Sequence, residues 1–339
     1  MDVLRWSDPP EGPALLLLDQ TRLPREEAVL VCRDVPAVVR AVRELAVRGA
    51  PLLGIAAGYG VALAAALGED VEAAARALAG ARPTAVNLAR GAERVLRAHR
   101  EGRPALAEAH AIADEEAAAS ARMAAHGLEL VPEGGRVLTH CNTGALAAGG
   151  DGTALGVVIA AHRAGRLTML WVDETRPLLQ GARLTAYEAA RHGLPHTVLP
   201  DGAAASLFAA GEVDLVVLGA DRIARDGSVA NKVGTYSLAV LARHHGVPFV
   251  VVAPTSTVDL ATRTGGDIPI ELRDPGEVTA FAGQPTAPLG SPVYNPAFDV
   301  TPGDLVTAIV TERGVIAPVN EGNLAALGDP PPISDDEGS

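Results

Sequence analysis

The sequence predicts an α/β protein in which a parallel, doubly wound sheet follows a smaller, mainly helical N-terminal region. From about residue 131, short strands rich in Val and Leu alternate with helical stretches, which is typical of a parallel sheet covered by helices on both faces. Before that point, Ala-rich segments with apolar residues at helical spacing dominate. Because 48% of residues are hydrophobic and only 3% aromatic, the core must consist of Ala, Val and Leu.

The first third of the chain is expected to begin with a strand and to continue as helices. The apolar run Ala14–Leu18 ends at Asp19 and lacks the basic flank of a signal peptide, so a strand is the better interpretation. Helical spacing of apolar residues predicts helices at Val35–Val47, Leu52–Leu67 and Ala105–His126. A further helix is expected to begin at Thr84, which is suited to be its N-cap.

The rest of the chain is expected to form the sheet. We expect strands at Arg136–Thr139, Thr168–Val172, Thr197–Leu199, Val213–Leu218 and Phe249–Ala253, the last of which closes the series. We expect helices at Thr153–His162, Leu184–Arg191, Asn231–His245 and, after a loop-rich region, Thr301–Thr311. Because ligands of doubly wound sheets lie beyond the carboxyl ends of the strands, residues directly after strands are the candidates for a site.

Charge and composition exclude several classes of partner. The net charge of −13 disfavours nucleic acid and anionic membranes. No stretch is expected to be apolar for about 18 residues, so no transmembrane helix is predicted. The two cysteines, Cys32 and Cys141, are too few and too far apart for a disulfide framework and favour a cytoplasmic protein with free thiols. The nine histidines form no spaced metal cluster, and we predict no metal.

Two strand ends carry candidate catalytic side chains. Cys141 follows the first strand of the sheet, where it is consistent with a nucleophile, an acid or base, a transition-state contact, or a small buried filler. Asp221 follows the very apolar strand Val213–Leu218. There, loss of water would raise a carboxyl pKa and suit it to proton transfer, although a helix cap or an ion pair with Arg222 is the alternative.

Other polar groups near strand ends and helix starts are candidates for binding. For Glu174 and Arg176 an internal ion-pair network is preferred, whereas the neutral Gln180 is suited to bonding a sugar hydroxyl. The segment Arg48–Pro51 places Gly49 and an arginine before a helix, which is a general anion site. Of the 28 basic residues only Lys232 is lysine. Because a compact ammonium fits where a planar guanidinium does not, a site role is preferred there over coding chance.

Seven segments in the same order closely resemble methylthioribose-1-phosphate isomerases, over about residues 3–318. This superfamily is shared with the regulatory subunits of the guanine-nucleotide exchange factor for translation initiation. The matching segments are Leu18–Thr21, Val47–Pro51, Arg82–Leu88, Thr139–Asn142, Asp173–Arg176 with Leu179–Ala186, Gly219–Ile223 with Ala230–Tyr236, and Asn295–Pro302.

The resemblance implies an enzyme of methionine salvage that converts 5-methylthioribose 1-phosphate to 5-methylthioribulose 1-phosphate without metal or organic cofactor. It also implies a homodimer, a small, mainly helical N-terminal domain with a small sheet (1–128) and a Rossmann-like catalytic domain (129–328). The Pro-rich and then acidic composition of the end of the chain predicts a disordered acidic tail (329–339). By motif position, Cys141 and Asp221 are the catalytic pair, and the substrate-binding residues are Arg48, Gly49, Ala50, Arg82, Gln180, Asn231 and Lys232.

Two departures from the family pattern leave alternatives open. Asp151–Gly152 stand where an aromatic residue and Gly are expected, and Asp201–Ala204 replace a segment with bulkier side chains that is expected to line the pocket. The alternatives are an isomerase of ribose 1,5-bisphosphate or 5-deoxyribose 1-phosphate, and a non-catalytic subunit of the translation-initiation type.

Overall fold

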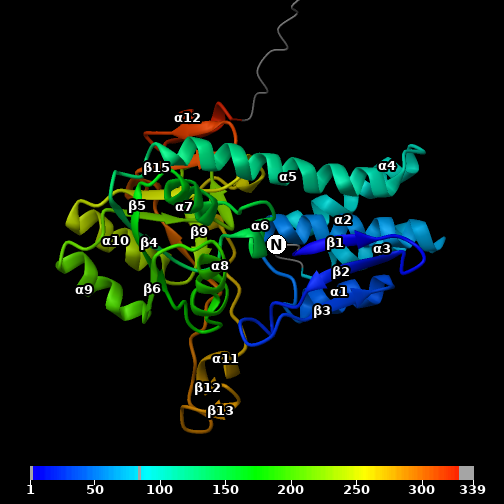
Figure 1. Cartoon of the computed structure of the whole chain (residues 1–339), viewed down its shortest axis with the longest axis horizontal. Coiled ribbons are helices and arrows are strands. Elements are labelled where there is room, and N and C mark those ends of the chain that lie inside the picture. The colour runs from blue at the N-terminus through cyan, green and yellow to red at the C-terminus, as the bar shows by residue number, and fades with distance from the viewer. Residues whose placement is uncertain (1–2, 83–84, 328–339) are drawn as a thin grey trace, which may run out of the picture.

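Residues 3–82 and 85–327 are described by the computed structural model of the chain, so the predicted N-cap Thr84 and the tail 329–339 lie outside the described residues. In residues 3–128 a small antiparallel sheet of order β1-β2-β3 packs beside helices (Figure 1). The predicted strand is β2. The elements are β1 (Leu4–Ser7), β2 (Ala14–Leu18), β3 (Val29–Cys32), α1 (Val35–Arg43), α2 (Ala50–Leu67), α3 (Val71–Ala79), α4 (Val86–Arg100) and α5 (Ala105–Leu128).

The helix α2 lies among α3, α4 and α5 and forms the centre of this part. Its 18 residues have a mean hydropathy of 1.8, and 78% of them are buried inside the fold. The expectation that no stretch of this length is apolar was therefore wrong, because a helix buried on every side is apolar on every side. Gly91 of α4 allows the close packing: a Cβ there would lie 2.1 Å from the carbonyl oxygen of Gly54.

In the described residues of the C-terminal part, seven strands form a sheet of order β16-β15-β10-β7-β4-β5-β6. All neighbours are parallel except the edge pair β15 and β16. The chain runs outward from β4 through β5 to β6, returns to β7 beside β4, and then continues outward through β10 to β15. The order therefore reverses between β4 and β7, the point where such sheets bind ligands. The strands are β4 (Gly135–Thr139), β5 (Leu167–Asp173), β6 (His196–Leu199), β7 (Leu215–Leu218), β10 (Phe249–Val252), β15 (Ala308–Thr311) and β16 (Gly314–Ile316).

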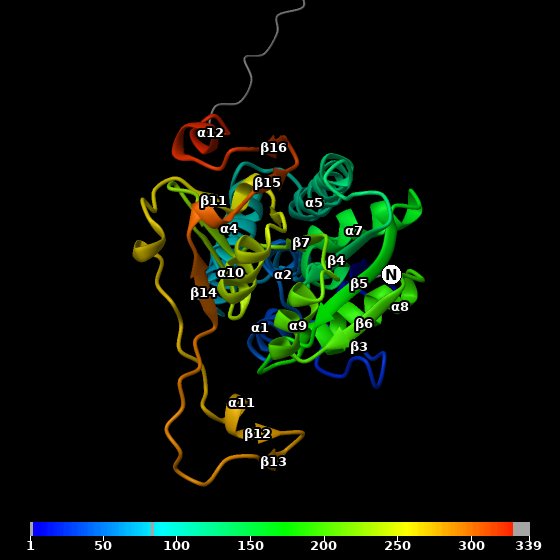
Figure 2. The same ribbon diagram turned by 90° about the vertical axis from the view of Figure 1, so that its left-hand side faces the viewer.

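Helices cover both faces of this sheet (Figure 2). Successive side chains of β4 point to opposite faces: Val137 belongs to a buried cluster with residues of α5 and α7, and Leu138 to a cluster with residues of α9 and α10. A sheet buried on both faces needs continuously apolar strands, which is why the sequence shows them. The helices after α5 are α7 (Ala154–Arg163), α8 (Ala186–Arg191), α9 (Ala204–Ala209) and α10 (Thr235–His245), with the short α6 (Ala145–Ala148) and α12 (Glu321–Ala325).

A second sheet, of order β11-β8-β9-β14, begins directly after Asp221. Before β14 the chain forms an arm, residues 272–296, that projects from the body (Figures 1 and 2) and contains α11 (Gly276–Thr279), β12 (Ala280–Phe281) and β13 (Gln284–Pro285). A bridge between Leu272 and Pro296 closes its base. The strands of the second sheet are β8 (Arg222–Ala224), β9 (Val229–Lys232), β11 (Val258–Asp259) and β14 (Phe298–Thr301).

The helices and strands expected up to residue 218 are present, with ends shifted by a few residues, and three later expectations were wrong. The helix expected at Asn231–His245 starts only at Thr235, because Asn231 and Lys232 pair with β14. The segment Thr301–Thr311 is not a helix: a short 3-10 turn leads into the apolar, β-branched β15, which pairs with β10. Phe249–Ala253 therefore does not close the sheet.

Candidate active site

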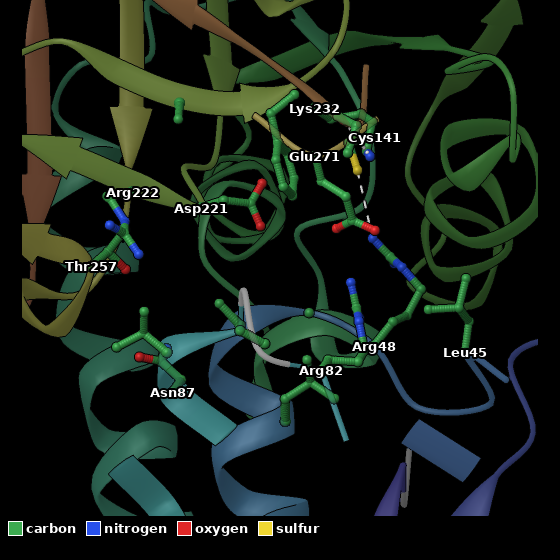
Figure 3. A pocket seen from close by; sticks show the side chains of 18 of the residues that line it. Leu45, Arg48, Arg82, Asn87, Cys141, Asp221, Arg222, Lys232, Thr257 and Glu271 are labelled. Carbon is green, nitrogen blue, oxygen red and sulfur yellow. Dashed lines mark hydrogen bonds between the residues drawn. The ribbon is translucent and has the colours of Figure 1, made fainter. Parts of the chain in front are cut away.

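A cavity of about 540 Å³ lies between the N-terminal part and the carboxyl ends of β4 and β7, a volume suited to a small metabolite. Figure 3 shows its side chains converging from both parts of the chain. The predicted site residues come together here, with Asn231 in an adjoining narrow extension. Those lining the main cavity are Arg48, Gly49, Ala50, Arg82, Cys141, Gln180, Asp221 and Lys232.

Cys141 directly follows β4 and has an unusual backbone. Its φ is +63°, a left-handed conformation that costs free energy for a residue with a side chain. Two threonine hydroxyls hold it: the Cys141 N–H donates to Thr175 Oγ1 (2.8 Å), and Thr185 Oγ1 donates to the Cys141 carbonyl (2.6 Å). The 7% exposed side chain thereby presents its sulfur to the cavity.

Asp221 follows β7, and its backbone N–H donates to the Ala230 carbonyl (2.9 Å). Its side chain opens into the cavity, so its surface is accessible there, but the walls separate it from most bulk water. This burial raises the pKa of Asp221, and the charges of Lys232, Arg48 and Arg82 oppose the rise. The carboxyl group therefore keeps a proton to higher pH than an ordinary aspartate. The alternative, an ion pair with Arg222, is absent from the described contacts, because Arg222 pairs with Asp259 (3.3 Å).

Arg48 reaches across the cavity to Cys141. Its Nη2 donates to the sulfur (3.6 Å), drawn as a dashed line in Figure 3, and its Nη1 donates to Asn142 Oδ1 (3.1 Å). The next residue, Gly49, starts α2 with φ +93°, and a Cβ there would lie 2.2 Å from the Ala147 carbonyl oxygen. The predicted anion site at this helix start therefore faces the cavity, with a glycine that the contact requires.

Lys232 is the last residue of β9. Its Nζ donates to the Ala297 carbonyl (2.7 Å) and lies 4.8 Å from the centre of the Phe298 ring. Burial lowers the pKa of Lys232, while Cys141 and Asp221 act in the opposite direction. An ammonium group has three donors, so donors besides the one to Ala297 are available to a ligand.

Arg82, Gln180 and Asn231 complete the predicted set. Burial lowers the pKa of Arg82, which points into the cavity in Figure 3. Gln180 is 3% exposed, and its Oε1 has no hydrogen-bond partner among the described residues. Such an oxygen normally finds a partner when buried, which favours a ligand donor there. Asn231 Nδ2 donates to Thr235 Oγ1 (3.0 Å).

Two expectations about loops next to the site were wrong. The loop Asp201–Ala204 is not among the described residues that line the cavity, because the Asp201 carboxylate accepts from the N–H groups of Thr175 and Arg176. Arg176 does not form the expected pair with Glu174 in the described contacts; it donates to the Val278 carbonyl of the arm (3.3 Å).

Sequence reasoning missed residues that support the site. Glu271, at the base of the arm, lines the cavity beside Arg48 in Figure 3, but its loop-rich surroundings carry no helical or strand pattern. Glu188 accepts from Asn142 Nδ2 (2.7 Å) from behind the cavity wall. Asn142 lies inside the segment that carries Cys141 and could have been found from that position.

His140, Asp173 and Asp201 form a compact group among the described residues. His140 Nδ1 lies 2.9 Å from Asp173 Oδ2, and Nε2 lies 2.9 Å from the Val233 carbonyl oxygen. Burial lowers the pKa of His140, but the hydrogen bond and charge of Asp173 outweigh it and leave the pKa raised. Both ring nitrogens of His140 thus have oxygen partners, and the ring fixes the chain beside Cys141.

Comparison with known proteins adds independent information. Residues 46–318 match the model of the initiation factor 2 subunit family. Methylthioribose-1-phosphate isomerases of Anaeromyxobacter dehalogenans and Pelotomaculum thermopropionicum are 59% and 53% identical, over 92% and 96% of this chain and 93% of each relative. The structure of 5-methylthioribose 1-phosphate isomerase from Pyrococcus horikoshii OT3 matches with a TM-score of 0.91 and 43% identity, covering 96% of this chain and 95% of that one.

A second solved structure is described as translation initiation factor eIF-2B, subunit delta, from A. fulgidus. It matches with a TM-score of 0.84 and 43% identity, over 95% of this chain and 99% of that one. The overall fold is therefore shared by proteins named as enzymes and as translation factors, and the residues of the site must separate the two classes.

Proposed function

Because the chain belongs to the initiation factor 2 subunit family and, within it, to the methylthioribose-1-phosphate isomerases, we propose that its cavity converts 5-methylthioribose 1-phosphate to 5-methylthioribulose 1-phosphate in methionine salvage. The observation that carries the proposal is that Cys141 and a protonatable Asp221 meet in one cavity of metabolite size with the predicted cations Arg48, Arg82 and Lys232. No metal or organic cofactor is needed for the steps below.

Arg48, Arg82 and the start of α2 bind the phosphate. Both arginines line the cavity together with Gly49 and Ala50 at the start of α2. Guanidinium groups and the N–H groups of a helix start match the charge and oxygen pattern of a phosphate. The orphaned Gln180 oxygen accepts from a sugar hydroxyl. Asn231 and Lys232 orient the remaining oxygens, which holds the sugar for reaction.

The phosphate on C1 prevents the ordinary opening of the sugar ring, so the ring oxygen must be protonated. Asp221, with its raised pKa, donates that proton, and the bond between C1 and the ring oxygen breaks. The hydrogen on C2 then moves to C1 while the Asp221 carboxylate takes the proton of the C2 hydroxyl, which leaves a ketone at C2. Aldose and ketose have the same atoms, and Asp221 regains its proton. The polarizable sulfur of Cys141 stabilises the positive character at C1.

The cavity walls favour an apolar 5-substituent over a second phosphate. Leu45, Leu178 and Ile268 contribute apolar surface. Two further arginines that line the cavity already pair with carboxylates: Arg222 with Asp259, and Arg273 with Glu277.

The direct test is proton NMR of purified protein with 5-methylthioribose 1-phosphate. We expect the C1 methylene signals of the ketose to appear, and faster conversion than with ribose 1,5-bisphosphate or 5-deoxyribose 1-phosphate. Faster conversion of either comparison substrate would assign the alternative. No conversion of any of the three would favour the non-catalytic role that the likeness to the A. fulgidus protein leaves as second candidate.

We further infer that the chain is a cytoplasmic homodimer with an N-terminal domain of residues 1–128 and a Rossmann-like domain of 129–328. The buried free thiols Cys32 and Cys141 support a reducing compartment. The arm carries two large, exposed side chains, Leu289 (106% exposed) and Tyr294 (81% exposed), which a second copy of the chain would cover in a dimer. Light scattering after size exclusion tests the dimer; a monomer at micromolar concentration would contradict it. Limited proteolysis that cuts near residue 128 would support the boundary.

A further inference from the structure

Glu188 of α8 is a buried carboxyl group that the proposed reaction does not use. It is 1% exposed and lies behind the wall of the cavity. Gly144 makes room for it, since a Cβ at that position would lie 2.4 Å from its carboxylate oxygens. Its described partners all donate: Asn142 Nδ2 (2.7 Å) and the N–H of Leu146 (3.3 Å), together with the N–H of Ala145. Such surroundings suit the ionised form, which only accepts.

The carboxylate determines which way the Asn142 amide faces. Because Asn142 Nδ2 donates to Glu188 Oε1, its Oδ1 points the other way and accepts from Arg48 Nη1 (3.1 Å). With the amide reversed, an NH₂ group would face the guanidinium, and the contact would be lost. The other guanidinium nitrogen of Arg48 is the one that donates to Cys141 Sγ.

A second branch runs from Asn142 to the backbone of Cys141. Asn142 Nδ2 also lies 3.2 Å from Thr185 Oγ1, which accepts from it and donates its own proton to the Cys141 carbonyl. Thr185 ends the π-helical turn η1 (Gly181–Thr185), and such turns often occur at functional sites. Both residues that meet at the sulfur, Arg48 and Cys141, therefore connect back to one carboxylate.

We propose that Glu188 is a positioning residue for the isomerase reaction, which fixes the Asn142 amide and thereby holds Arg48 against Cys141 across the junction of the two parts of the chain. This inference rests on the roles proposed above for Arg48 and Cys141. Burial raises the pKa of Glu188 to about 7, against which its hydrogen bonds act. These contacts favour the ionised form, and the loss of one of them would raise the pKa further.

Glu188→Gln keeps the shape but puts an NH₂ group against one of the donors. We expect kcat/KM for 5-methylthioribose 1-phosphate to fall about tenfold to a hundredfold, with a higher KM, because misplacement of a binding group by about 1 Å costs that much. Inorganic phosphate should inhibit correspondingly less. Asp214→Asn is the matched control: Asp214 pairs with Arg136, which lies in β4 close to its amino end and away from the cavity, and kcat/KM should change by no more than about twofold.

The decisive variant is the reciprocal exchange Glu188→Gln with Asn142→Asp. In it, the amide introduced on α8 donates to the carboxylate introduced beside Cys141 and still accepts from the Leu146 N–H, while that carboxylate still accepts from Arg48. The carboxylate cannot donate to Thr185 Oγ1, so the rescue should be partial. Asn142→Asp alone sets two carboxylates against each other. We expect the double variant to exceed each single variant about tenfold in kcat/KM, a rescue that loss of packing alone would not give.

The proposal is overturned if the double variant is no better than Asn142→Asp, including the case in which it does not fold. It is also overturned if Glu188→Gln, folded by circular dichroism, keeps kcat/KM and phosphate inhibition within about twofold of the wild type. Arg48→Lys separates this failure from that of the site: an unchanged phosphate inhibition there would remove Arg48 from the site itself.

Discussion

Replacing Asp221 by Asn removes the proposed proton donor while keeping the size of the side chain. General acid–base catalysis by one positioned group accelerates a reaction by about 10² to 10⁴. That corresponds to about 2.7 to 5.4 kcal/mol in the barrier, since each factor of ten is about 1.4 kcal/mol. The fold should survive, because Asp221 opens into the cavity and its backbone N–H keeps its bond to Ala230. We therefore expect kcat to fall by at least about a hundredfold with unchanged circular dichroism.

Asp259 provides the matched control, because it is a second carboxylate lining the same cavity. Burial raises its pKa, but hydrogen bonds from Thr262 and the charge of Arg222 outweigh this and leave the pKa lowered. It therefore holds no proton to donate near neutral pH. Asp259→Asn should change kcat by less than about threefold, because the pair with Arg222 is partly exposed and contributes little. Proton NMR measures both variants, and equal losses, or a loss below tenfold for Asp221→Asn, would refute the assignment.

Further outcomes follow from the same geometry. Cys141→Ala should lower kcat at least about a hundredfold with little change in Tm, because the sulfur that faces Arg48 is lost but little volume is; near-normal turnover would remove Cys141 from the mechanism. Lys232→Arg should lower kcat/KM about tenfold or more, because the ammonium lies between the Ala297 carbonyl and an aromatic ring where a guanidinium does not fit. An unchanged kcat/KM would mean that the single lysine of the chain reflects chance in a coding bias towards arginine. Gly49→Ala should destabilise the fold by about 1 to 3 kcal/mol in denaturant titration, because its Cβ would collide with the Ala147 carbonyl, whereas Gly68→Ala, which shares the positive φ at the other end of α2 but has open space around it, should cost less.

The residues of the site could be predicted because they follow apolar strands or precede a helix. Cys141 and Asp221 stand directly after β4 and β7, and the reversal of strand order between those strands brings them to one cavity. Lys232 was found for a different reason, as the one lysine of an arginine-rich chain. Their catalytic and binding roles remain predictions that the variants above test.

What the sequence could not predict depends on pairing between distant segments. The strand character of Asn231 and Lys232 arises from β14, which lies more than sixty residues later. The apolar, β-branched β15 looked helical after Thr301–Pro302, and only its place beside β10 decides otherwise. Glu188 was missed because a glutamate in a short helix resembles a solvated one unless Gly144 is known to admit it.

The cavity has one wall from α2 and its neighbours and another from the strand ends, so a bound sugar phosphate acts as a brace across that junction. Ligand binding therefore also stabilises the fold. At a ligand concentration of about one hundred times Kd, the free energy of unfolding rises by about 2.7 kcal/mol. Arg48 on one wall donates a hydrogen bond to Cys141 on the other, so the protein itself also links the two walls. The free energy of unfolding should therefore rise with substrate concentration, so that occupancy of the cavity sets how firmly the two walls are joined.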